Sequence, residues 1–220
     1  MNFKNIIAAA LAIAVLGASF GAHAYEDGDF QIWHTQAQDF SFGKKAHVTM
    51  EEEFRYGGDA SQFYYQHYQA GLAYDVNKYL GVEADYRQIW DLKNGKFEPE
   101  YRPHLNATIK LAAYGFKLSD RNRLEFRYFD DRSTGLRYRN KLTLKYPLTL
   151  GGFGFEPYVA DEIFADLEGV IIRTNRLYAG MGLDLVKHLK GEVYYLLQSS
   201  KKSGKWTNAN VLGLKLKLSF

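Results

Sequence analysis

The chain has 220 residues, 28 Lys and Arg against 25 Asp and Glu, and no cysteine. The near balance of charge argues against a nucleic-acid-binding protein. The lack of cysteine excludes disulfides, thiolate metal sites and cysteine nucleophiles. At this length we expect one domain rather than two.

The N-terminus has the three parts of a secretory signal peptide. Lys4 supplies a positive charge, residues 6–20 are apolar or small, and Ala22-His23-Ala24 is a small-x-small cleavage site. The apolar run is shorter than the roughly 20 residues that a membrane-spanning helix needs. We therefore predict that residues 1–24 are removed during export through the general secretory pathway, and that residues 25–220 form the mature protein.

Segments that alternate apolar and polar residues follow one another along the mature chain. Turn signals such as Gly57-Gly58, Asn94-Gly95 and Gly151-Gly152 separate them. We count eleven segments: 30–40, 47–56, 63–74, 80–90, 104–116, 121–129, 136–146, 155–164, 173–185, 188–198 and 206–220. This spacing predicts an all-β, up-and-down antiparallel barrel. Because such a meander closes antiparallel only with an even number, we expect ten or twelve strands.

The segments have one apolar face and one charged face. Leu124, Phe126 and Tyr128 alternate with charged residues, for example, and no segment looks apolar on both sides. A soluble sandwich or lipocalin-type cup would have to pack all the large aromatic residues into a single layer. The pattern is more typical of a transmembrane barrel, whose outer face meets lipid and whose lumen is polar. We therefore predict a barrel in the outer membrane of a Gram-negative bacterium.

The last segment supports this localisation. Residues 212–220 alternate apolar and polar side chains and end on an aromatic residue. Such an ending resembles the sorting signal that bacterial outer-membrane barrels present to their insertion machinery. We assign the predicted assembly signal to Leu214, Leu216, Leu218 and Phe220.

Several short motifs carry a resemblance to a known family. They are Glu53-Phe54-Arg55-Tyr56-Gly57, Arg102-Pro103-His104, residues 122–127, residues 137–142, Glu162-Ile163-Phe164 and Asn175-Arg176-Leu177. With these motifs the chain resembles a family of secreted bacterial proteins catalogued only as a domain of unknown function, which implies an outer-membrane barrel and no assigned activity. The resemblance covers essentially the whole mature chain, and in size and strand pattern the chain is also similar to the small monomeric acidic-sugar porins.

The polar faces of the segments define a candidate lumen with more basic than acidic groups. Its basic excess lies between Arg123 and Lys145, and we name Arg123, Arg127, Arg137, Arg139 and Lys141 as a candidate anion track. Candidate lumen ion pairs come from Glu51, Glu53, Arg55, Glu83, Asp85, Arg87, Glu125, Glu162 and Arg176. Two interpretations remain open. These charges either fill a narrow lumen as structural ion pairs or select anions that pass through it.

Three functions therefore remain open from the sequence. The first is a passive channel or binding barrel for small anionic solutes, the second a lipid-modifying enzyme, and the third a closed structural barrel whose loops bind an envelope partner. Residues 25–220 contain no Gly-x-Ser-x-Gly or His-Glu-x-x-His motif, and His67 is the best candidate for a base. We expect no catalytic residues, no metal and no cofactor. The expected surroundings are outer-membrane lipid and the insertion machinery, with no nucleic acid, and we expect a monomer.

Overall fold

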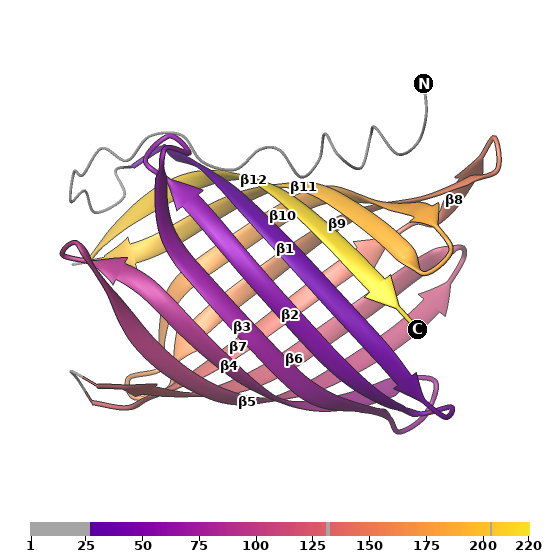
Figure 1. Ribbon diagram of the computed structural model, residues 1–220, viewed down its shortest axis with the longest axis horizontal. Coiled ribbons are helices and arrows are strands. Elements are labelled where there is room, and N and C mark those ends of the chain that lie inside the picture. The colour runs from indigo at the N-terminus through magenta and orange to yellow at the C-terminus, as the bar shows by residue number, and fades with distance from the viewer. Residues whose placement is uncertain (1–26, 131–132, 203) are drawn as a thin grey trace.

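The computed structural model describes residues 27–220, apart from 131–132 and 203. The predicted signal peptide lies outside these residues, so its cleavage stays a prediction. The described chain forms one twelve-stranded sheet that closes into a barrel (Figure 1). Its strands are β1 (Asp29–Phe42), β2 (Ala46–Gly57), β3 (Gln62–Asp75), β4 (Leu80–Lys93), β5 (Lys96–Ala113), β6 (Phe116–Phe129), β7 (Gly135–Lys145), β8 (Leu148–Leu150), β9 (Phe153–Asp166), β10 (Ile171–Val186), β11 (Leu189–Lys202) and β12 (Lys205–Ser219). The predicted all-β, up-and-down barrel is confirmed.

Eleven of the twelve strands close the barrel. β8 pairs only with β9, and it continues the register that β7 holds with β9 on the other side of Pro147. Proline lacks the N–H that a continuous strand would use, which explains the interruption. The β8–β9 hairpin extends beyond its neighbours at one end of the barrel (Figure 1).

The closing pair is parallel. Asp29 pairs with Ala209 and Asp39 with Ser219, so β1 and β12 run in the same direction. The expectation of an even number assumed antiparallel closure, and that assumption is wrong. Because the first and last strands are parallel, the barrel can close with an odd number of strands. The two ends of the described chain therefore lie at opposite ends of the barrel. Apart from residues 131–132 and 203, nothing between residues 27 and 220 forms a helix long and apolar enough to cross a membrane.

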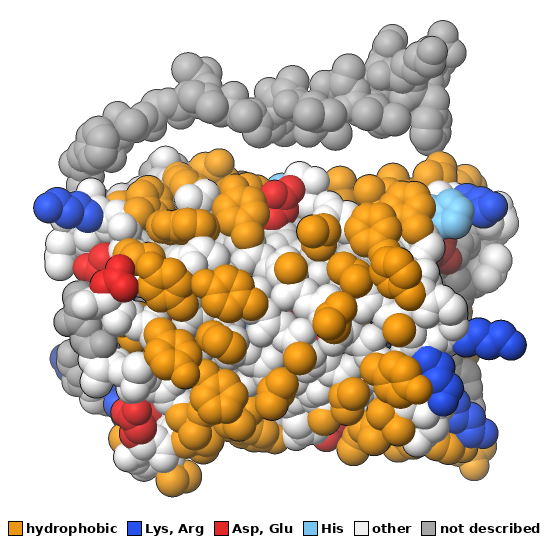
Figure 2. Space-filling model, turned by 60° about the horizontal axis from the view of Figure 1, so that its bottom comes forward, with side chains coloured by type: hydrophobic (Ala, Val, Ile, Leu, Met, Phe, Trp, Pro, Cys, Tyr) orange, Lys and Arg blue, Asp and Glu red, His pale blue; other side chains and the backbone are white. Residues whose placement is uncertain are grey.

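Side chains alternate between the lumen and the outer face. Outward-facing Leu72, Leu105, Leu142, Leu177 and Leu214 are each 44–68% exposed. Figure 2 shows hydrophobic side chains spread over one side of the barrel, with most charged side chains near its ends. Exposed aromatic residues lie toward both ends of the strands: Phe30, Tyr56, Phe97, Tyr128 and Trp206 toward one end, and Phe42, Tyr74, Phe116, Tyr146 and Phe220 toward the other.

One strand departs from the predicted pattern. In β11, Val193 and Tyr195 face outward and are exposed, whereas Tyr194 and Leu196 face the lumen and are buried. This strand is therefore apolar on both faces, contrary to the expectation that no segment would be. The lumen beside Tyr194 and Leu196 holds packed aromatic and aliphatic side chains, and Glu192 adds one charged group on the same face.

Candidate functional site in the lumen

A layer of buried side chains crosses the lumen. Every one of the eleven barrel strands contributes at least one residue that is at most 9% exposed. Register pairs and side-chain contacts link these residues around the barrel. We call them the lumen layer: Trp33, Glu53, His67, Arg87, His104, Glu125, Arg139, Glu162, Arg176, Leu196 and Val211.

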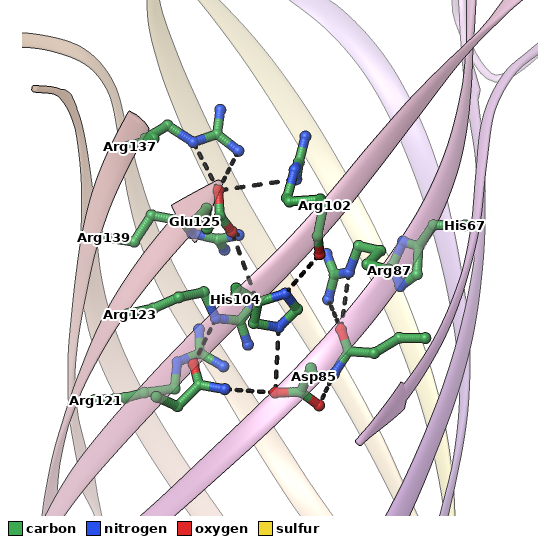
Figure 3. A network of polar contacts seen from close by, with 12 residues as sticks. His67, Asp85, Arg87, Arg102, His104, Arg121, Arg123, Glu125, Arg137 and Arg139 are labelled. Carbon is green, nitrogen blue, oxygen red and sulfur yellow. Dashed lines mark hydrogen bonds and ion pairs between the residues drawn. The ribbon is translucent and has the colours of Figure 1, made fainter. Parts of the chain in front are cut away.

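Glu125 is the centre of the charged half of the lumen layer. Its carboxylate, which has no exposed side-chain surface, lies 2.5 Å from Arg137, 2.7 Å from Arg139, 3.7 Å from Arg123 and 3.9 Å from Arg102. Figure 3 shows these guanidinium groups pointing toward the same carboxylate. Hydrogen-bonded pairs of this kind are the strong form of a charged contact. Glu125 therefore neutralises much of the basic excess that the sequence places on β6 and β7.

Glu162 holds a second group of cations. It accepts hydrogen bonds from Arg139 at 2.8 Å, from Arg121 at 2.9 Å and from the Tyr178 hydroxyl at 2.9 Å. Arg176 lies 3.8 Å away on the next strand. Arg139 thus bridges two buried carboxylates, one on β6 and one on β9.

Asp85 on β4 connects the charged half of the lumen layer to Gln69 on β3. Asn106 donates to it at 2.7 Å and Gln69 at 2.8 Å, and Gln69 in turn accepts a hydrogen bond from Arg87. His104 lies 3.3 Å from Asp85 through Nε2 and contacts the Arg102 carbonyl oxygen through Nδ1, so Nδ1 is the donor. Figure 3 shows this part of the network beside the Glu125 cluster.

The other half of the lumen layer is aromatic and aliphatic. Trp33, Tyr158, Tyr194, Leu196 and Val211 belong to one buried cluster from β1, β9, β11 and β12. The Tyr194 ring lies against Gly213, where a Cβ atom would be only 1.9 Å from the ring. Glycine is therefore required at this position by the close approach of the ring.

Trp33 links the two halves. The guanidinium groups of Arg55 and Arg176 lie 3.7 Å and 4.7 Å from its ring. Both distances are within the range of cation–π interactions. Its indole N–H donates to Gln31 at 2.9 Å.

The structure brings the candidate anion track together on the lumen side of β6 and β7, with its charges largely occupied. Arg127 makes two hydrogen bonds to Glu100, at 2.7 and 3.0 Å, and Arg137 and Arg139 pair with Glu125 as described. Arg123 donates to Asn106 at 2.6 Å. Lys141 differs from the others, because its ammonium lies 3.6 Å from the Tyr178 ring centre and pairs with no described carboxylate.

The remaining candidates also have side chains in the lumen or on the outer strand face. Glu53 pairs with Arg55 at 2.5 Å, and Arg87 with Glu51 at 3.2 Å. Glu83 accepts hydrogen bonds from Thr49 at 2.9 Å and from Asn106 at 3.2 Å. The proposed assembly residues Leu214, Leu216, Leu218 and Phe220 are exposed on the outer side of β12 and its end.

Sequence reasoning missed part of the network on β5. The segment expected here begins only at residue 104, whereas β5 is continuous from Lys96 and places Glu100 and Arg102 in the lumen. Their pairing to β6 is interrupted only at residues 102 and 103, where proline cannot donate. The alternation of Glu98, Glu100, Arg102 and His104 could have revealed this strand. Arg121, another missed residue, also belongs to a longer strand than expected.

The one contact between a serine hydroxyl and a histidine ring among the described residues does not form an activated nucleophile. His67 contacts the Tyr65 hydroxyl at 3.2 Å and Glu51 at 3.3 Å. Ser41 lies 3.4 Å from Nδ1 of His47, but the same nitrogen is 3.1 Å from Asp39 and Nε2 is 3.4 Å from Asp75. Asp39 and Asp75 therefore compete with Ser41 for both nitrogens of this histidine, which disfavours it as a base for Ser41. Over the described residues, no group of three or more acidic or histidine side chains is arranged to hold a metal ion.

Fold and site together define a class: a closed, mostly antiparallel up-and-down β-barrel whose lumen is crossed by buried ion pairs and an aromatic cluster. The family model described as protein of unknown function (DUF2490) matches residues 30–209, and the chain belongs to that family. Comparison with curated proteins gives no match, and neither does comparison with solved structures.

Proposed function

We propose that this protein is an exported outer-membrane β-barrel that is closed to solutes in its resting state. The observation that carries the closed state is the lumen layer, to which every barrel strand contributes a buried side chain. Within that layer the carboxylates of Glu125 and Glu162 occupy the positions beside the arginines that a passing anion would need. The arginines of the candidate anion track therefore act mainly as partners in structural ion pairs.

The outer face supports the membrane location. An apolar band with aromatic residues toward both ends is the pattern of outer-membrane barrels, whose band is about 25 Å tall. In water the same surface would be a large exposed apolar patch, which soluble monomers rarely carry. Outer-membrane lipid is accordingly the main partner that we propose.

Cell fractionation tests the location. We expect the folded protein in the outer-membrane fraction, soluble only with detergent, and with gel mobility that changes on heating. Recovery from the periplasm as a soluble protein without heat-modifiable mobility would contradict the proposal.

The insertion machinery is a second proposed partner, through Phe220. The Phe220 ring also stacks on Phe40 and His188, with ring centres 5.5 and 5.6 Å apart. Deleting Phe220 should leave export intact and hold the chain in the periplasm. If Phe220 served only to stack on Phe40 and His188, its deletion would instead give an inserted barrel of lower stability. The same fractionation therefore distinguishes an assembly signal from a stabilising contact.

Planar-bilayer recording tests the closed state. Purified, heat-modifiable protein should insert without producing stable conductance steps. A reproducible conductance from the folded parent protein would contradict a closed lumen and favour the anion channel.

Anion binding without transport is a second candidate function, and Lys141 favours it. This lysine is a lumen cation without an ion-paired carboxylate among the described residues, in contrast to Lys215, which pairs with Glu51 at 2.7 Å. Inorganic sulfate, used as the probe, should raise the unfolding temperature of the parent protein and have a weaker effect on Lys141→Gln. Equal shifts in both proteins would exclude Lys141 as the binding group.

A further inference from the structure

The apolar outer face is interrupted by polar residues near the middle of β6, β7, β9 and β10. We call this group the outer polar belt: Asp120, Asn122, Tyr138, Asn140, Asp161 and Asn175. Two rows of register partners contain five of the six residues, and Tyr138 lies in the next row. One runs Asn122, Asn140, Ile163, Asn175, and the other runs Asp120, Leu142, Asp161, Leu177.

The belt residues hydrogen-bond to one another without using all of their polar atoms. Asn140 donates to Asp120 and, at 3.2 Å, to Asn122, whose oxygen also accepts from the Tyr138 hydroxyl. Asn175 donates to Asp161 at 2.6 Å. Each of these two carboxylates uses only its Oδ1 atom in these bonds, and the Asn122 amide nitrogen donates to no described residue. The belt therefore offers both acceptors and a donor to a partner.

These atoms are costly if the surface faces lipid. A bilayer interior supplies no water to complete the hydrogen bonds, and ionisable residues there normally face protein or a water-filled cavity. We propose that the outer polar belt is the interface between two copies of this chain, an inference that rests on the proposed membrane location. Sequence patterns alone favour a monomer, since they do not reveal that these residues share one patch.

A second copy fits because the belt is self-complementary. A two-fold axis along the barrel axis, close to β7, places β6 of one copy against β9 of the other. The unused Asn122 donor of each copy then faces the strand that carries the Asp161 acceptor. Leu142 and Ile163, which lie between the polar residues in the two rows, supply apolar packing. Two-fold interfaces of this kind are the commonest in homo-oligomers.

Another polar patch offers a competing interface. His34, Gln36, Gln38 and Glu52 share the outer side of β1 and β2, where Gln36 contacts His34 at 3.2 Å. Contact between this patch and the belt would join copies head to tail and produce open chains instead of closed dimers. Only the two-fold arrangement brings a belt residue close to its own copy, because the head-to-tail contact places the belt of one copy against the β1–β2 patch of the next.

Single-cysteine crosslinking distinguishes them, since the chain has no native cysteine. Leu142→Cys reports on the belt and leaves all six polar residues intact. Met50→Cys is the matched control, because Met50 and Leu142 are both 45% exposed and Met50 pairs with Gln38 at the competing patch. Each variant is reconstituted in lipid vesicles, treated with a short bis-maleimide and analysed for covalent dimer, after heat-modifiable mobility has verified folding.

We expect a dimer from Leu142→Cys and little from Met50→Cys. Adding Asn122→Leu and Asp161→Leu to Leu142→Cys should weaken dimerisation about tenfold, because both copies then lose the donor and the acceptor that the interface brings together. Equal crosslinking of both cysteine variants, crosslinking only at position 50, or no covalent dimer from folded Leu142→Cys would overturn the dimer. Recovery of the parent protein as a soluble periplasmic protein would instead refute the membrane location.

Discussion

The two halves of the lumen layer close the barrel with different chemistry. On β4 to β7, buried arginines surround Glu125, and Asn106 donates a hydrogen bond to Asp85 beside them. On β11, β12 and β1, Leu196, Val211 and Trp33 pack as an ordinary hydrophobic core. A buried charge is stable only while its partners are present, whereas an apolar cluster depends on volume and shape. The charged half should therefore be sensitive to loss of charge, and the apolar half to added atoms.

Glu125→Ala should have the largest effect. It leaves Arg137, Arg139 and Arg102 without the buried carboxylate that they share. Removing one partner of a buried pair typically costs about 3–5 kcal/mol. Urea unfolding of the protein in vesicles, followed by gel mobility, should show a loss of that order. A loss below 1 kcal/mol would mean that water replaces the carboxylate and that the layer is not dry.

Gly213→Ala tests the apolar half. The new methyl group would overlap the Tyr194 ring, whose nearest atoms lie 1.9–2.4 Å from the Cβ position. Overpacking of this kind costs about 1–3 kcal/mol. The matched control is Gly135→Ala on β7, where no atom lies within 4 Å of the added Cβ. Equal stability of the two variants would show that the Tyr194 ring moves away without cost.

Trp33→Phe tests the contact between the halves. The smaller ring retains an aromatic face for Arg55 and Arg176, and it loses the hydrogen bond that the indole N–H donates to Gln31. We expect a loss of about 1 kcal/mol, the usual net contribution of one such bond. Gln31→Leu should cost less in the Trp33→Phe background than in the parent protein if the bond is the cause, and the loss that remains belongs to the bonds of Gln31 with Tyr64 and Asp29. An additive loss would assign the effect to packing.

The sequence predicts the charged half better than the apolar half. Alternation of charged and apolar residues correctly indicates which face of β6 and β7 carries Arg123, Glu125 and Arg139. Alternation is uninformative on β11, where Tyr194 and Tyr195 are chemically alike but face opposite sides. The parallel closing pair is also invisible in the sequence, because register between the first and last strands depends on the whole sheet. Pairing between particular side chains, such as Arg127 with Glu100, requires neighbouring strands that the pattern around Pro103 concealed.

The smallest expected effect is that of Glu156→Gln, which separates burial from charge. Glu156 is also a lumen carboxylate with two cationic partners, Lys117 at 2.9 Å and Lys145 at 3.1 Å. Its side chain is 26% exposed, however, and the two lysines are 57% and 36% exposed. Exposed ion pairs contribute up to about 1 kcal/mol and weaken as salt screens them. The loss should therefore stay below about 1 kcal/mol and shrink further at 1 M salt, whereas that of Glu125→Ala should be largely insensitive to salt. The free energy of unfolding lost in Glu156→Gln could instead be as large and as insensitive to salt as that lost in Glu125→Ala. The end of the lumen would then be as dry as the lumen layer, and burial would not explain the difference between the two carboxylates.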